Sequence, residues 1–279
     1  MAAIAGFSVI NTIVKITRVP AVSFAFYRLW LGGAAMLLVS LGAGRRVSRS
    51  QLMASLPGGV LFGLNITLFF SALKLTSVAD VLIIASLQPA LTFLVAGRLF
   101  GERVSVHDVA WSLVSLGGVA LVIVGSSGTP VWSLRGDLLA VGALLAWTIY
   151  FLVSKRVRQT VPALQYMTAV TLTAATVVTP LALLSGQSLA HARWQDWLWL
   201  ALFLVGAQGG HVLLAWAHPQ VDVSVSSLLT LAEPIISAVA ALIVLGEPLP
   251  AVAVAGGLLV VSSVGAVIRR TTREAPSVE

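Results

Sequence analysis

Residues 222–247, DVSVSSLLTLAEPIISAVAALIVLGE, decide the fold of this chain. Residues 222–245 are long and apolar enough to cross a bilayer as a helix, which takes about 20 residues. Glu233 lies about 11 residues from each end of this segment, hence roughly 16 Å deep at about 1.5 Å per residue. A charge at that depth costs roughly 2.5–3.5 kcal/mol and normally faces a cavity or a partner. Pro234 follows Glu233 and predicts a break in the helix there.

The rest of the chain has the same apolar character. Of its 279 residues, 58% are hydrophobic and 10% are charged, whereas roughly 25% of a soluble domain is charged. This composition argues against a soluble enzyme, a nucleic-acid-binding module and a disordered protein. Ten apolar segments follow one another, at about 2–17, 21–42, 52–73, 76–97, 108–126, 137–154, 162–185, 197–217, 222–245 and 251–268. Because they are long and continuously apolar, they predict an all-α integral membrane protein with ten transmembrane helices.

The stretch around Glu233 has a counterpart earlier in the chain. A shift of 145 residues places Gln88-Pro89 on Glu233-Pro234 and Gly101-Glu102 on Gly246-Glu247. The alternative to a true repeat is chance similarity among apolar segments. A repeat of five helices divides the chain into residues 1–130 and 131–279, and an odd number of helices makes the two copies cross the membrane in opposite senses. Inverted repeats are typical of secondary transporters, with the substrate site at the midplane between the halves.

Lysine and arginine placement predicts the orientation. With a cytoplasmic N-terminus, the inner loops and tail hold 11 of the 17 basic residues: Arg45, Arg46, Arg49, Arg98, Arg103, Lys155, Arg156, Arg158, Arg269, Arg270 and Arg273. The outer ends hold only Arg18, Lys74, Arg135 and Arg193. We therefore expect a multi-pass protein of the plasma (inner) membrane with both termini in the cytoplasm. The net charge of +7 then reflects topology and contact with anionic lipid, and no nucleic-acid partner is expected.

Several polar or aromatic residues join Glu233 as candidates for substrate binding or coupling. One helical face of segment 222–245 carries Asp222, Ser226, Thr230, Glu233 and Ser237. Gln88 lies at the matching depth of segment 76–97, so that Pro89 and Pro234 predict paired helix breaks. The remaining candidates are Asn11, Lys15, Arg28, Asn65, Trp147, Tyr150 and His211. The alternatives are helix–helix hydrogen bonding for the polar face, snorkelling to headgroups for Lys15 and Arg28, and packing for the aromatic residues and His211.

Motifs for enzymatic chemistry are missing from the sequence. The chain has no cysteine, and its four histidines form no short metal-ligand spacing. GxxxxGK[ST] and GxSxG are also absent, so we expect no ATP hydrolysis, no metal, no cofactor and no enzyme. Two other classes stay open. A membrane-embedded enzyme would lack a catalytic pair here, and a non-catalytic subunit, such as the permease partner of an ATPase, would need a longer cytoplasmic coupling loop.

Taken together, these residues resemble the EamA family of the drug/metabolite transporter superfamily. Lys15 followed by Phe24-Ala25-Phe26-Tyr27-Arg28-Leu29 is similar to the first two helices of that family. Its AL…(S/T)xA…P…GE pattern resembles Ala72-Leu73, Ser77-Val78-Ala79, Gln88-Pro89 and Gly101-Glu102, and again Ala217, Val223-Ser224, Glu233-Pro234 and Gly246-Glu247. The family's Trp-Gly element is present only as Gly6-Phe7-Ser8. The resemblance implies two inverted five-helix repeats around a central cavity, and proton-driven export of small metabolites, often amino acids or their derivatives.

The sequence thus predicts a secondary active transporter, a proton-coupled exporter of a small polar or zwitterionic metabolite by alternating access. Its partners would be the substrate, protons and the lipid bilayer. Glu233 would meet an amino group or carry the coupling proton, and Lys15 or Arg28 would hold a carboxylate. Asn65, Gln88 and the polar face would supply hydrogen bonds, and Glu102 and Glu247 would be helix-end or gating contacts. The alternative is a facilitative metabolite or drug carrier.

Overall fold

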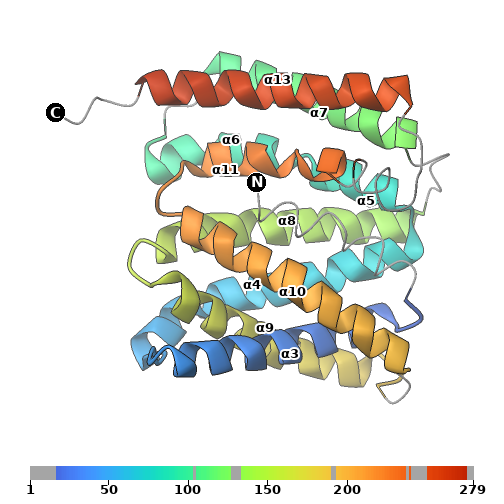
Figure 1. Ribbon diagram of the computed structural model, residues 1–279, viewed down its shortest axis with the longest axis vertical. Coiled ribbons are helices and arrows are strands. Elements are labelled where there is room, and N and C mark those ends of the chain that lie inside the picture. Colours follow the sequence, from blue (N-terminus) through green and yellow to red (C-terminus); the bar gives the residue numbers. More distant parts are fainter. Residues whose placement is uncertain are drawn as a thin grey trace.

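Apolar helices make up most of the chain (Figure 1). The computed structural model describes residues 17–102, 105–126, 133–189, 193–236, 239 and 250–274, and it contains no strand within them. The helices are α3 (Ala21–Gly42), α4 (Arg49–Leu75), α5 (Val78–Ala85), α6 (Gln88–Phe100), α7 (Val106–Ser126), α8 (Leu134–Val157), α9 (Ala163–Leu184), α10 (Trp194–Ala217), α11 (Val223–Thr230) and α13 (Ala251–Glu274). Across the described residues, eight helical stretches are long and apolar enough to cross a membrane.

Helix boundaries agree with the apolar segments and are extended where a cap is available. The segment predicted at 52–73 begins earlier, because Ser48 and Gln51 form a capping box. The Ser48 hydroxyl accepts from the Gln51 amide at 3.2 Å, and the Gln51 side chain accepts from the Ser48 amide at 3.0 Å. The segment at 2–17 lies outside the described residues except for its last residue, and the segment at 222–245 is described continuously only as far as 236.

Two apolar helical stretches are interrupted near their proline residues. A turn at Ser86-Leu87 separates α5 from α6, and Pro89 lies in the first turn of α6, where its missing N–H leaves no bond unmade. Residues 231–232 form a second turn after α11, and helical structure resumes at 233–236. Each interruption therefore directly precedes the Gln88-Pro89 or Glu233-Pro234 pair, and the 145-residue shift superimposes residues 86–87 on 231–232.

Helices pack closely where glycine removes the side chain. At Gly59 of α4, an added Cβ would lie 2.4 Å from Cβ of Thr173 on α9, and at Gly256 of α13 it would lie 2.4 Å from the carbonyl oxygen of Gly118 on α7. Glycine at these positions lets the backbones of neighbouring helices approach closely. Close packing of this kind stabilises helix association in a membrane, where there is no hydrophobic driving force between helices. Figure 1 shows α7 and α13 along one side of the molecule and α3 and α9 along the opposite side, with α4, α8, α10 and the broken helices between them.

The helices alternate in direction, which gives the bundle two ends. At one end of the bundle, α6 and α8 end and α11 begins, and we call it the Glu102 end. At the other end, α4 ends and α5 and α8 begin, and we call it the Asp80 end. At the Asp80 end, Lys74 contacts the carbonyl oxygen of Thr17. At the Glu102 end, Asp108 of α7 and Arg270 of α13 form an ion pair.

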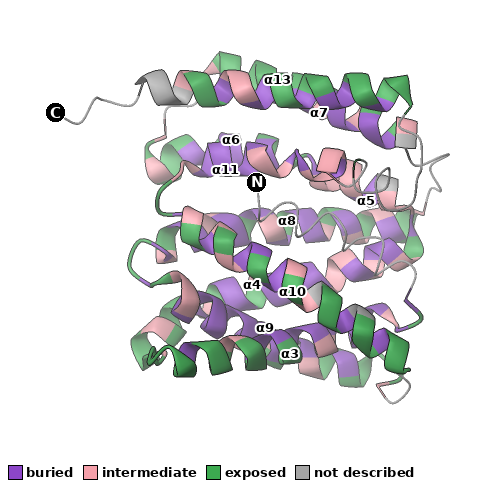
Figure 2. Ribbon diagram, viewed as in Figure 1, coloured by how far each residue is buried: buried purple, intermediate pink, exposed green. Residues whose placement is uncertain are grey.

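Large apolar side chains cover the outside of the bundle (Figure 2). Leu38 of α3 is 70% exposed, Val205 of α10 is 80% exposed and Leu258 of α13 is 64% exposed. A surface of this kind is unfavourable in water and is what contact with lipid requires. The structure is therefore that of a helical protein that crosses the membrane several times.

Candidate functional site

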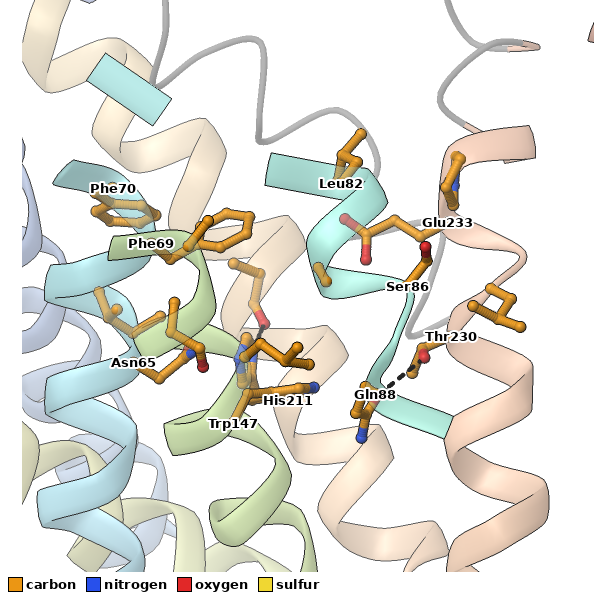
Figure 3. Close-up of a pocket in the computed structure, with 18 of the residues that line it drawn as sticks. Asn65, Phe69, Phe70, Leu82, Ser86, Gln88, Trp147, His211, Thr230 and Glu233 are labelled. Atoms are coloured by element: carbon orange, nitrogen blue, oxygen red, sulfur yellow. Dashed lines mark hydrogen bonds between the residues drawn. The ribbon is translucent and has the colours of Figure 1, made fainter. Parts of the chain in front are cut away.

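A cavity lies where the two interrupted helices face α4, α8 and α10 (Figure 3). It encloses about 980 Å³ of empty space, counted out to its open mouth. Its polar lining consists of Arg28, Asn65, Ser86, Gln88, His211, Thr230 and Glu233. Its larger apolar lining residues are Ile66, Phe69, Phe70, Leu82, Leu144, Trp147, Leu231 and Pro234.

The two interrupted helices are joined at the cavity by a side-chain hydrogen bond. Thr230 ends α11 and Gln88 begins α6. The Thr230 hydroxyl lies 3.1 Å from Oε1 of Gln88 (Figure 3) and 2.5 Å from the carbonyl oxygen of Ser227 within α11, and its one proton is shared between these two acceptors. Gln88 is 1% exposed, and its Nε2 has no hydrogen-bond partner among the residues that the structure describes. The side-chain oxygen of Gln88 is therefore held by Thr230, while its side-chain N–H groups can donate to another group.

Glu233 is the acidic residue of the cavity lining. It is the first residue after the turn at 231–232, and its side chain is directed into the cavity between Leu82 and Ser86 (Figure 3). The helix break thus separates Glu233 from the regular face that carries Thr230. A carboxyl group on the wall of a cavity can meet a cationic group or exchange a proton.

Arg28 brings a positive charge to the same cavity. Its side chain is 1% exposed, and its guanidinium carbon lies 5.3 Å from the ring centre of Phe62 and 5.9 Å from that of Phe70. Both distances are typical of cation–π contacts. Snorkelling of Arg28 to the headgroups is therefore wrong, because its face of α3 packs against aromatic residues of α4 rather than lipid.

Asn65 and His211 are held in place by backbone carbonyl groups. Asn65 donates from Nδ2 to the carbonyl oxygen of Ala143 at 2.9 Å, which joins α4 to α8. Nδ1 of His211 lies 2.6 Å from the carbonyl oxygen of Ala207. With a proton on Nδ1, the Nε2 atom of a neutral His211 ring is an acceptor.

Aromatic side chains form one wall of the cavity. Trp147 lines it together with Phe69 and Phe70. Tyr150 lies behind Trp147, with the ring centres 5.1 Å apart, and its hydroxyl approaches the sulfur of Met167 at 3.7 Å. Tyr150 is 1% exposed and is not among the cavity-lining residues, so its direct contact with substrate is not supported. Phe69 and Phe70 escaped the sequence analysis because nothing distinguishes them within an apolar segment.

The remaining candidates lie elsewhere or are not described. Ser226 is 4% exposed and is not among the cavity-lining residues, because it lies one helical turn before Thr230 on α11, farther toward the Glu102 end. Pro89 lines a separate depression that includes Phe93 and Val109. Asn11, Lys15 and Ser237 lie outside the described residues. The structure therefore brings together eight of the candidates: Arg28, Asn65, Gln88, Trp147, His211, Thr230, Glu233 and Pro234.

Comparison with known proteins identifies the family of this chain. The model of the EamA-like transporter family matches residues 1–124 and 134–269. The uncharacterized transporter YvbV of Bacillus subtilis (strain 168) is 28% identical over 255 residues, which cover 88% of this chain and 81% of YvbV. The aromatic amino acid exporter YddG of Ancylobacter novellus is 33% identical over 132 residues, which cover 45% of this chain and 46% of YddG.

A solved crystal structure has a similar fold. It covers 98% of this chain and 98% of its own, with a TM-score of 0.82 and a sequence identity of 22%. At that identity the likeness concerns the fold alone. The family model, in contrast, matches nearly the whole chain, and the family is one of transporters rather than enzymes. The chain belongs to the EamA-like transporter family.

Proposed function

We propose that this protein is a proton-coupled exporter of amino acids or closely related zwitterions. The observation that carries the proposal is the presence of Glu233 and Arg28 on one cavity beside the aromatic residues Trp147, Phe69 and Phe70. A zwitterion has an ammonium group for the carboxylate and a carboxylate for the guanidinium. An aromatic wall favours a substrate with a large apolar or aromatic side chain. The similarity to an aromatic amino acid exporter supports the same substrate class.

The proposed architecture is ten helices in two inverted repeats, residues 1–130 and 131–279. The two stretches matched by the family model support this division, as does the pairing of the breaks before Pro89 and Pro234. Gln88 and Thr230 would then lie at the junction between the halves. Rocking of the halves about this junction would open the cavity to either side of the membrane in turn.

The proposed location is the plasma (inner) membrane, with the Glu102 end of the bundle on the cytoplasmic side. Arg45 and Arg46 lie between α3 and α4 at this end, Arg49 begins α4, and Lys155 and Arg156 lie in the last turn of α8. The Asp80 end carries fewer basic residues. The positive-inside rule therefore favours the Glu102 end as the inner one.

In the proposed cycle, Glu233 carries either the proton or the ammonium group of the substrate, but not both. Binding of one would displace the other, which is how a single carboxyl group couples two opposite flows. Arg28 would hold the substrate carboxylate, and Asn65 and His211 would add hydrogen bonds. Because Asn65 and His211 are fixed by backbone carbonyl groups, they would discriminate by shape rather than adapt to each substrate.

Counterflow in liposomes tests the function. Purified protein is reconstituted in liposomes preloaded with unlabelled amino acids, and uptake of labelled phenylalanine, leucine, alanine and lysine is followed. We expect transient accumulation that is largest for phenylalanine and is abolished by omission of the preload. Absence of exchange for every amino acid, with folding verified by gel filtration, would contradict the substrate class. Exchange that is indifferent to a pH gradient would favour a facilitative carrier.

A further inference from the structure

Glu102 joins two helices at the Glu102 end of the bundle. Gly101 ends α6 with a left-handed conformation (φ 68°), and Glu102 follows directly. One oxygen of the Glu102 carboxylate accepts from the amide of Val223 at 2.6 Å. The other accepts from the amide of Ser224 at 3.1 Å and from its hydroxyl at 2.6 Å. A single side chain thus makes three hydrogen bonds to the first turn of α11.

These contacts are strong for a physical reason. The first N–H groups of a helix have no partner within the helix, and the helix dipole gives this end a partial positive charge. A carboxylate is therefore well suited to bind there, through charge-assisted hydrogen bonds. Asp222 occupies the N-cap position of α11 but makes no side-chain cap hydrogen bond. The cap is supplied instead by Glu102, from a residue about 120 positions earlier in the sequence.

A layer of buried apolar side chains, which we call the closed layer, lies between the Glu102 contact and the cavity. Ala96, Phe151 and Val223 form a buried apolar cluster, and each is completely inaccessible to solvent. Lys155 of α8 donates to the carbonyl oxygen of Val221, immediately before α11. The cavity described above ends at Gln88 on α6 and at Thr230 on α11, which are both on the far side of this cluster from Glu102.

We propose that the Glu102 carboxylate is a latch that closes the Glu102 end of the transport path. A substrate passing from the cavity to this end must move between α6 and α11, and the three hydrogen bonds of Glu102 span that seam. They must therefore break when this end opens, and their presence stabilises the state in which the cavity is reached from the Asp80 end. The proposal rests on alternating access in the proposed function. It assigns to Glu102 a control of the conformational equilibrium, separate from substrate binding.

The absence of cysteine from the sequence permits a direct test. Two single-cysteine reporters are made, Ala96→Cys within the closed layer and Ala85→Cys in the cavity lining. Their reaction rates with a maleimide are measured in detergent, where both ends of the protein are accessible. Each reporter is combined with Glu102→Ala, with Ser224→Ala and, as a matched control, with Asp222→Asn, which alters a neighbouring carboxylate that makes no cap bond.

With Glu102→Ala we expect the Ala96→Cys reporter to react about tenfold faster, which corresponds to about 1.4 kcal/mol in the opening equilibrium. Ser224→Ala removes one of the three donors and should give an increase of about two- to threefold. The Ala85→Cys reporter should react no faster in either variant, and Asp222→Asn should change neither rate. An unchanged Ala96→Cys rate in Glu102→Ala would overturn the latch. Faster reaction of both reporters would also overturn it, because it would indicate general loosening.

Neither reporter requires a substrate. Failure of the counterflow experiment would therefore contradict the proposed function without altering these rates. Conversely, intact counterflow with an unchanged Ala96→Cys rate would contradict the latch alone.

Discussion

The hydroxyl of Thr230 donates a hydrogen bond to the side-chain oxygen of Gln88, 3.1 Å away and 142 positions earlier in the sequence. Thr230 is the last residue of α11 and Gln88 is the first residue of α6. The bond therefore fixes two helix interruptions to each other at the wall of the cavity. Because Gln88 is held in this way, substrate contacts made at the junction should depend on Thr230.

Replacing Thr230 with Val removes the hydroxyl while keeping the shape of the side chain. The one proton of the hydroxyl is shared between Gln88 and the carbonyl oxygen of Ser227, and one hydrogen bond contributes about 1 kcal/mol, so we expect half-saturation of counterflow to rise by up to about fivefold. Thr92→Val is the matched control, since the Thr92 hydroxyl bonds to the Gln88 carbonyl oxygen and does not line the cavity. Equal effects of the two substitutions would argue against a role for the Thr230–Gln88 bond in binding.

Trp147 should distinguish aromatic substrates from small ones. An aromatic pair contributes about 0.5–1.5 kcal/mol beyond burial, and truncation also removes apolar contact. We expect Trp147→Ala to weaken phenylalanine transport about tenfold and alanine transport about twofold or less, as measured by half-saturation. Trp111→Ala, on α7 and outside the cavity lining, should change neither. Loss of the same magnitude for both substrates would contradict an aromatic wall for substrate.

Close packing of α4 on α9 should make Gly59 intolerant of a methyl group. An added Cβ would lie 2.4 Å from Cβ of Thr173, whereas at Gly42 it would meet nothing within 4 Å. Overpacking costs roughly 1–3 kcal/mol. Thermal unfolding in detergent should therefore show a lower Tm for Gly59→Ala and little change for Gly42→Ala. A Tm of Gly59→Ala equal to that of the parent protein would refute the close approach.

His218, directly after α10, should make stability depend on pH. Burial, with a smaller effect of the Lys155 and Arg158 cations, lowers the pKa of His218 from 6.5 to about 3. The neutral ring accepts or donates at Nδ1 toward the Ser154 hydroxyl, 2.7 Å away. Because the pKa is lowered on folding, the unfolded state binds more protons below pH 6.5. Stability contributed by His218 is therefore full above about pH 6.5 and decreases as the pH falls toward 3.

The matching experiment compares the parent protein with His218→Asn in detergent between pH 7 and pH 4.5. Over this range the free energy of unfolding should decrease by about 2–3 kcal/mol more in the parent protein than in the variant, which is seen as a steeper decrease of Tm. Parallel pH profiles would show that burial of His218 does not contribute to acid sensitivity.

Much of the fold could be predicted from the sequence because lipid imposes long apolar helices. The described helices follow the apolar segments closely, and the two interruptions fall near the helix breaks predicted at the two prolines. Their location just before Pro89 and Pro234 was harder to predict, since proline only removes a hydrogen bond and the turn itself forms in the preceding residues. The beginning of α4 depended on a capping box, which hydropathy does not detect.

The candidate site was only partly predictable. Glu233 and Gln88 could be found because polar groups at the membrane midplane are rare, and both line the cavity. Helical spacing alone placed Tyr150 beside Trp147 but gave no information on which of the two rings lines the cavity. The same spacing assigned Ser226 to the face of Glu233, although the intervening break ends that register. The partners of Glu102 depend on the approach of α6 to α11, which no local pattern encodes.

The most direct test of proton-coupled transport is accumulation driven by a pH gradient. Liposomes with an acidic interior are diluted into alkaline buffer containing labelled phenylalanine, and internal label is followed with the parent protein and with Glu233→Gln. We predict accumulation above the external concentration with the parent protein only. The Glu233→Gln variant should remain folded and should not accumulate substrate. Accumulation by Glu233→Gln equal to that of the parent, or a parent protein indifferent to the gradient, would contradict the account.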